Sequence, residues 1–452
     1  MTTLKDELTH THPARQRLAL ALAVSVTVPA IALRVLDPSL PDPVEAAIFG
    51  LGIVGAAFIL SWAAEVAQLD ISAGLAIALL ALIAVLPEYA VDFVFAWQGG
   101  NSFEATGPAC LPLGEGGTES PCSLALANMT GANRLLIGIG WTMVVFIAWT
   151  RIRKRDGSAA VRRWEGVKLD REHSIELAYL AVATLYSLTL PLKHSITPID
   201  AAVLITIFVL YTIRVSRAPA EEPHLVGPAR YLGTFTTVGR RTSIVLMFMF
   251  AAGVILLCAE RFAHALVETG ADLGISEFFL VQWLAPLASE APELLVAGLY
   301  AWRLNTNAGL GTLVSSKVNQ WTLLVGTLPI VFSIAAGGLH GLPIDAVQRE
   351  ELFLTAAQSF FAVAVLSNLS MSLREAWFLF GLFWAQFVLG AIVPESLHGV
   401  ERIAVGCVYM ALGLWLFIGD RQRLPQMLRD GFRTPYADLA EPVNEPGRRT
   451  VP

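Results

Sequence analysis

The chain has 452 residues, and charged residues make up only 15% of them, whereas a soluble domain averages about 25%. Hydrophobic residues reach 55% and form blocks of about twenty, the length that crosses a hydrocarbon core of about 30 Å. The net charge of −6 comes with scattered Lys and Arg and no basic stripe, and the apolar blocks show no two-residue alternation. These features exclude a soluble protein, a nucleic-acid-binding protein and a β-barrel.

The apolar blocks predict an all-α integral membrane protein with about twelve transmembrane helices. The first block is read as a retained span rather than a signal peptide, because Asp37-Pro38 follows it without a small-residue cleavage site. The spans are expected at 16–36, 45–67, 71–97, 123–149, 175–191, 198–214, 242–263, 276–302, 308–335, 352–370, 374–393 and 401–419.

The distribution of Lys and Arg sets the orientation. With a cytoplasmic N-terminus and twelve crossings, 24 of the 31 Lys and Arg residues fall on the cytoplasmic side and five outside. The positive-inside rule therefore predicts that both termini are cytoplasmic, in a membrane of the bacterial inner-membrane type. The two remaining basic residues, Arg134 and Lys317, lie inside spans.

The connection over residues 98–122 is expected outside the cytoplasm, and it carries Cys110 and Cys122 but no Lys or Arg. A disulfide between the two cysteines would persist there. Two free thiols remain the alternative.

An internal repeat links two distant spans. Leu86-Pro87-Glu88 and Ala291-Pro292-Glu293 both lie in mid-span, and each span is followed by one rich in small and amide residues. The two spans run in opposite directions in the predicted topology, so the repeats are inverted, which in transporters marks a binding site near the midplane. Pro87 and Pro292 are expected to break their helices and free carbonyl oxygens. Carboxylate and carbonyl oxygens are ligands that calcium and sodium accept.

At these residues the chain resembles the cation/calcium exchanger (CaCA) superfamily, the sodium/calcium and calcium/proton antiporters. Members pair a Gly-Thr-Ser-x-Pro-Glu helix with a Gly-Asn-x-x-Gly-Ser-Asn helix in each of two alpha-repeats, and the resemblance covers residues 71–149 and 276–335. It implies two inverted five-helix repeats with one extra helix at each end. The implied organisation is an N-terminal segment with the extra helix (1–44), a first repeat (45–214), a cytoplasmic linker (215–241), a second repeat (242–393), an extra helix (394–420) and a cytoplasmic polar tail (421–452).

By position, the resemblance implies that Glu88 and Glu293 are the central ion-binding, metal-ligating glutamates and that Asn128 and Asn133 are amide ligands. Ser289 keeps one hydroxyl of the family pattern. Two further acids join this candidate site, because Asp92 lies four residues after Glu88, and Glu290 lies three residues before Glu293, on the same helix faces.

Arg134 follows Asn133 directly, and Lys317 stands where the second companion helix of the family has an amide. Two interpretations are open for these bases. Both could be permanent charge compensation for the buried acids. Alternatively, Lys317 could be released from a carboxylate when a cation or proton arrives and so couple the exchange.

The sequence therefore predicts a secondary active cation antiporter, with calcium or another cation bound between Glu88 and Glu293 and exchanged for protons. The alternatives are a sodium/proton antiporter on the same fold, and a transport-inactive or sensory member whose ion site is filled by Arg134 and Lys317. An enzyme is not expected, because the chain has no zinc-protease or nucleophile-elbow motif. The expected partners are inorganic cations, protons and the lipid bilayer, with no cofactor other than the transported cation; the oligomeric state is left open.

Overall fold

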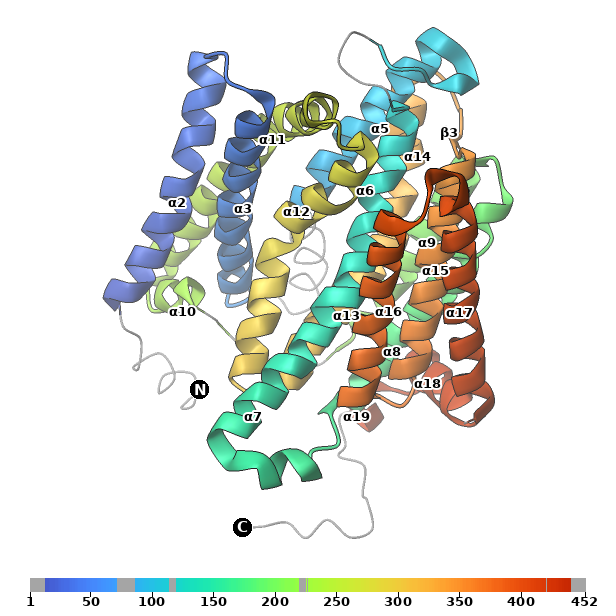
Figure 1. Cartoon of the computed structure of the whole chain (residues 1–452). Coiled ribbons are helices and arrows are strands. Elements are labelled where there is room, and N and C mark those ends of the chain that lie inside the picture. Colours follow the sequence, from blue (N-terminus) through green and yellow to red (C-terminus); the bar gives the residue numbers. More distant parts are fainter. Residues whose placement is uncertain are drawn as a thin grey trace.

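The computed structural model describes residues 13–70, 86–113, 119–218, 225, 227–419 and 421–439, and these residues are almost entirely helical (Figure 1). The α-helices are α2 (Pro13–Leu36), α3 (Asp42–Ala67), α5 (Leu86–Thr106), α6 (Pro121–Leu135), α7 (Thr142–Arg163), α8 (Ser174–Ser187), α9 (Pro198–Val215), α10 (Pro228–Gly233), α11 (Thr237–Leu273), α12 (Glu277–Trp302), α13 (Thr306–Asn319), α14 (Val325–Ala335), α15 (Ala346–Leu366), α16 (Leu373–Ile392), α17 (His398–Gly419), α18 (Arg423–Phe432) and α19 (Tyr436–Leu439).

Short elements connect or interrupt these helices. The 3₁₀ turns are η1 (Gly107–Ala109), η3 (Arg171–His173), η4 (Leu190–Leu192) and η6 (Glu395–Leu397), the π-helical segments are η2 (Leu136–Trp141) and η5 (Gln320–Leu324), and the strands are β1 (Val167–Lys168), β2 (Ser195–Ile196), β3 (Leu342–Pro343) and β4 (Ser370–Met371).

The prediction of an all-α membrane protein is confirmed. Each predicted span coincides with a helix or a run of helices, the third of them from Leu86 onward; the start of that span lies outside the described residues. Among the described residues, eight helical stretches are long and apolar enough to cross a membrane. The other four predicted spans contain α5, α12, α15 and α16.

The four two-residue strands of the described residues are arranged as the inverted symmetry of the repeats requires. In the first repeat β1 precedes α8 and β2 follows it, while β3 and β4 flank α15 in the same way in the second repeat. The strands pair across the repeats, β1 with β4 and β2 with β3. Each strand therefore pairs with the non-equivalent strand of the other repeat, as a two-fold axis in the membrane plane requires.

Helix starts are repeated as well. Thr197 caps α9 and forms a capping box with Asp200, and Ser372 does the same with Glu375 at the start of α16. In a capping box, each side chain accepts a hydrogen bond from a backbone N–H that the first helical turn leaves without a partner. The equivalent helices of the two repeats thus begin by the same local chemistry.

The helices outside the repeats cover opposite ends of the molecule (Figure 1). At one end α2 packs against α3 and α11, where Gly52 lets the backbones approach, because an added Cβ would lie 2.6 Å from the Cβ of Ala30. At the other end α17 packs along α15. The four helices that carry the candidate site, α5, α6, α12 and α13, lie between these ends.

Candidate ion-binding site

Four acidic side chains converge where α5 meets α12. Glu88 and Asp92 lie on one face of α5, and Glu290 and Glu293 lie on one face of α12. Glu88 and Glu290 are 2% and 3% exposed and Asp92 is fully buried. The carboxyl group of Glu88 interacts electrostatically with those of Glu290, Asp92 and Glu293. Helices of both repeats thus bring their acids to one place.

Two amides on the companion helices hold two of these acids. The Nδ2 of Asn128, on α6, donates to Oδ1 of Asp92 at 2.7 Å. The Nε2 of Gln320, in η5, donates to Oε1 of Glu290 at 2.5 Å. Each repeat therefore uses an amide of one companion helix to orient a carboxylate of a Pro-Glu helix.

Many oxygens of this cluster accept no hydrogen bond within the described part of the chain. They are both Oε atoms of Glu88, Oδ2 of Asp92, Oε2 of Glu290, Oε2 of Glu293, Oδ1 of Asn128 and Oε1 of Gln320. A buried acceptor without a donor costs about 1–3 kcal/mol, and more when it is charged. A bound cation or bound protons would satisfy these oxygens. Over the same described ranges, no group of three His, Cys, Asp or Glu side chains has the arrangement of a preformed metal site.

The candidate residue Ser289 lies one residue before Glu290 and is buried. Its hydroxyl donates to its own helix, with Oγ at 3.2 Å from the carbonyl oxygen of Pro286 and 3.4 Å from that of Ala285. The hydrogen of the hydroxyl is thus used within α12, and only the lone pairs of Oγ are left for a ligand.

Lys317 and Asn133 meet across the two repeats. Lys317 is fully buried on α13, and its Nζ donates to the backbone oxygen of Asn133 at 2.7 Å and to Oδ1 of the same residue at 2.6 Å. The Nδ2 of Asn133 donates to the carbonyl oxygen of Met129 at 2.9 Å. Asn133 thus contacts the ammonium and its own helix rather than the four acids.

The two companion helices change geometry at matching points. The π-helical segment η2 begins three residues after Asn133, and η5 begins three residues after Lys317. π-Helical turns widen a helix locally and are frequent at functional sites. Asn133 and Lys317 therefore occupy equivalent positions in the two repeats.

One expectation about the prolines is wrong. Pro292 was expected to break its helix, but α12 continues from Glu277 to Trp302 through both Pro286 and Pro292. Proline removes one N–H donor and displaces one carbonyl, but packing on both sides can hold the remaining turns in place. Pro87 is the second described residue of α5, and the stretch before Leu86, including the carbonyl expected to be freed there, lies outside the described residues.

The first proline of α12 explains a close helix crossing beside the site. The carbonyl oxygen of Gln282 lies four residues before Pro286, which has no N–H to donate to it. This carbonyl packs against Gly131 of α6, where an added Cβ would lie only 1.7 Å from the oxygen. Gly131 is thus the point at which α6 and α12 touch backbone to backbone.

Arg134 does not face the four acids, which counts against the alternative in which it helps to fill the ion site. Its NH1 pairs with Oε2 of Glu351 at 2.6 Å, and its NH2 donates to Oε1 of Gln386. Its guanidinium also stacks on the ring of Trp283, 5.0 Å from the centroid. Arg134 therefore compensates Glu351, on α15, and leaves the central cluster to Lys317.

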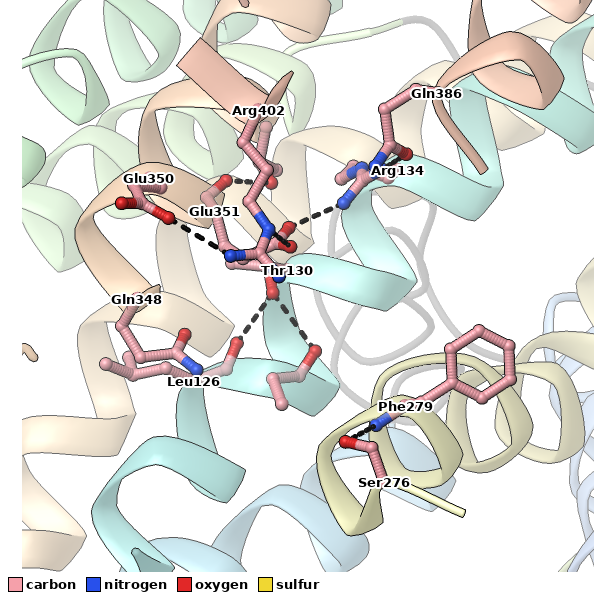
Figure 2. Close-up of polar contacts among 12 residues, drawn as sticks. Leu126, Thr130, Arg134, Ser276, Phe279, Gln348, Glu350, Glu351, Gln386 and Arg402 are labelled. Atoms are coloured by element: carbon pink, nitrogen blue, oxygen red, sulfur yellow. Dashed lines mark hydrogen bonds and ion pairs between the residues drawn. The ribbon is translucent and has the colours of Figure 1, made fainter. Parts of the chain in front are cut away.

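The same network extends to α17, as Figure 2 shows. Arg402 pairs with Oε1 of Glu351 at 2.8 Å and with Oε2 of Glu350 at 3.0 Å. Glu351 and Gln386 also line a cavity of about 240 Å³ at the starts of α12 and α17. Sequence reasoning missed Glu351, because the predicted span began at 352 whereas α15 begins at Ala346.

The connection between α5 and α6 is closed by a disulfide between Cys110 and Cys122. Both cysteines are buried against α5, with the sulfur of Cys110 at 3.4 Å from the carbonyl oxygen of Gly99. The disulfide thus fixes the entry of α6, the helix that supplies Asn128 and Asn133, to the end of α5.

The amino-acid sequence matches the family model described as sodium/calcium exchanger protein over residues 44–217 and 243–392. These two stretches contain both Pro-Glu helices and both companion helices, and together they exceed half of the chain. The chain belongs to the sodium/calcium exchanger family. In this family member the match ends before α17, so the helix that supplies Arg402 lies beyond the matched region.

Solved structures are similar to this exchanger-family chain. The crystal structure of the H+/Ca2+ exchanger CAX is 40% identical, with a TM-score of 0.83 over 93% of this chain and 98% of that chain. The structure of native YfkE shares the fold at 13% identity, with a TM-score of 0.54 over 88% of this chain and 100% of that chain. No curated protein matches the sequence.

Proposed function

We propose that this family member is a secondary active antiporter that exchanges calcium for protons at the cluster of Glu88, Asp92, Glu290 and Glu293. The observation that carries the proposal is the convergence of these carboxyl groups from the two Pro-Glu helices, with Glu88, Asp92 and Glu290 buried. The 40% identity to a protein described as an H+/Ca2+ exchanger supports the choice of ions.

Competition for the same oxygens is the basis of exchange. Carboxylates with free lone pairs bind a hard divalent cation well, and the same oxygens bind protons when the cation leaves. Isolated buried charges would be too costly to leave uncompensated. One ligand must therefore replace the other, which couples calcium movement to proton movement in the opposite direction.

The amides set which oxygens are available. Asn128 holds Oδ1 of Asp92 and Gln320 holds Oε1 of Glu290, so that the second oxygen of each acid is left for the cargo. Oδ1 of Asn128 and Oε1 of Gln320 add neutral acceptors. Such a mixed set of carboxylate and amide oxygens suits calcium.

The cation is cargo rather than a resident cofactor in this proposal. We further propose that the protein lies in a bacterial inner membrane with both termini cytoplasmic, which rests on the distribution of Lys and Arg. The disulfide-closed connection between α5 and α6 would then lie on the oxidising side.

The test is transport by purified protein in liposomes that contain a pH-sensitive dye. Calcium, sodium, potassium and magnesium are added separately across an imposed pH gradient, with Glu290→Gln and, as a matched control, the exposed Asp156→Asn. We expect calcium to drive proton movement in the wild type and in Asp156→Asn, and not in Glu290→Gln. Proton movement driven by sodium and not by calcium would favour a sodium/proton antiporter, and no response to any cation in folded protein would refute antiport.

A further inference from the structure

Lys317 is a buried basic side chain whose Nζ contacts neutral groups. Its Nζ is bound by two oxygens of Asn133 and lies 5.1 Å from the centroid of the Trp321 ring. Glu88 and Glu290 interact with it electrostatically, yet Lys317 forms no ion pair among the described residues. A buried ammonium next to acids ordinarily pairs with one of them, because an unpaired buried charge is costly.

The contact between Lys317 and Asn133 joins equivalent positions of the two repeats. Asn133 and Lys317 lie at equivalent points, each three residues before a π-helical segment. Two neutral side chains there would leave oxygens free for a second cation beside the acid cluster. The second repeat supplies an ammonium instead, and both oxygens that Asn133 offers are bound by it.

We propose that Lys317 is a resident cation that occupies one cation position of the site and makes exchange independent of sodium. This inference rests on the proposed calcium/proton exchange and adds the determinant of its ion selectivity. Because an ammonium is a compact point charge on a flexible four-carbon stem, it can exchange partners without a large movement of α13.

The partners exchange in step with the cargo. With calcium on the carboxylates, the ammonium would be repelled from them and stay on the two oxygens of Asn133 that it contacts in this structure. When calcium leaves, the ammonium turns to Glu88 and Glu290, whose charges already act on it. In the calcium-bound state the ammonium fills the position at Asn133, and in the calcium-free state it neutralises the acids that a monovalent cation would otherwise bind, so sodium has no favourable place at either stage.

A permanent structural contact between α6 and α13 is the competing explanation, and charge-changing variants separate the two. Lys317→Gln removes the resident charge but keeps a hydrogen-bonding side chain. Lys317→Arg keeps a fixed charge. Asn133→Asp turns the neutral partner into a carboxylate, which would hold the ammonium on α6 throughout the cycle.

The experiment measures calcium-driven proton movement in liposomes with and without sodium. We expect sodium to leave the wild type and Lys317→Arg unaffected, but to raise the apparent calcium constant of Lys317→Gln about tenfold, which corresponds to about 1.4 kcal/mol. We expect Asn133→Asp to fold and to lose at least about tenfold in turnover. Lys317→Gln that transports calcium indifferently to sodium, or Asn133→Asp with wild-type turnover, would overturn the proposal.

A measurement of sodium binding tests the proposal for variants that do not transport. Sodium is expected to raise the apparent melting temperature of purified Lys317→Gln in detergent, and to leave that of the wild type unchanged. Equal shifts, or none in either protein, would contradict a resident cation. Failure of the proposed calcium/proton exchange would be distinguished from failure of this inference, because in that case the wild type itself would move no protons in response to calcium.

Discussion

The crossing of α6 and α12 at Gly131 supports a quantitative prediction for Gly131→Ala. The new Cβ would lie 1.7 Å from the carbonyl oxygen of Gln282 and 2.7 Å from its carbonyl carbon, whereas ordinary contact for a Cβ begins at 3.4 Å. The two groups must therefore part by about 1.7 Å, the difference between 3.4 and 1.7 Å. Both obstructing atoms belong to a helix backbone, so no side-chain rotation relieves the clash.

Overpacking of this kind costs about 1–3 kcal/mol, and occasionally more where the neighbour is rigid. We expect Gly131→Ala at or above the upper end of that range. The displacement would also shift Asn128 and Asn133, which lie within one turn of Gly131, so calcium-driven proton movement should fall with stability.

The assay is thermal unfolding in detergent, followed by tryptophan fluorescence, with liposome transport on the same preparations. The matched control is Gly253→Ala, also within a long helix, where an added Cβ meets nothing within 4 Å. We expect the control to stay within about 1 kcal/mol of the wild type. If Gly131→Ala melts and transports like Gly253→Ala, the argument for a backbone contact at this crossing is refuted.

Three further predictions follow from contacts outside the acid cluster. Glu351→Gln leaves Arg134 buried without its carboxylate and should lower the free energy of unfolding by about 3–5 kcal/mol. The neighbouring Glu350→Gln affects only the more exposed pair with Arg402 and should lower it by no more than about 1 kcal/mol. Equal losses in the two variants would contradict the network. Cys110→Ser opens a loop of about 13 residues and should lower the free energy of unfolding by about 2–4 kcal/mol. Dithiothreitol should destabilise the wild type by a similar amount and leave the stability of the variant unchanged. Arg240 and Arg241 donate hydrogen bonds to Asp70 and hold the pKa of its carboxyl below its usual value. The resulting stabilisation is complete above the unfolded pKa of about 3.9 and is lost as the pH falls through the lower, folded pKa. Asp70→Asn should therefore melt at a lower temperature than the wild type at neutral pH and at the same temperature in strong acid; a difference in melting temperature that widens in acid would contradict this sign.

Much of the fold could be predicted from hydrophobic block length, because a lipid-exposed backbone must satisfy its own hydrogen bonds and so forms helices. The repeat was visible in two Pro-Glu pairs and in the small, amide-rich spans that follow them. The paired strands β1 with β4 and β2 with β3 were not predicted, since two-residue strands carry no periodic signal. The π-helical segments η2 and η5 likewise have no pattern in composition.

The positions of the buried basic residues could also be predicted from the sequence, whereas their side-chain partners could not. Counting bases within spans singled out Arg134 and Lys317, but a count gives no direction for a side chain. Arg134 turns to Glu351, a residue that a predicted boundary placed outside the membrane, while Lys317 turns to Asn133. The contribution of Gln320 was equally hidden, because its role depends on where α13 meets Glu290 in space.

The central claim is that calcium and protons compete for the oxygens of Glu88, Asp92, Glu290 and Glu293. The most direct test is isothermal titration of the purified protein with calcium at one pH in two buffers of different ionisation enthalpy, because the difference between the apparent binding enthalpies gives the protons released per calcium bound. The account predicts at least about one proton released per calcium, and loss of both binding and release in Glu290→Gln. Calcium binding with no proton release, or binding that survives in Glu290→Gln with unchanged affinity, would contradict it.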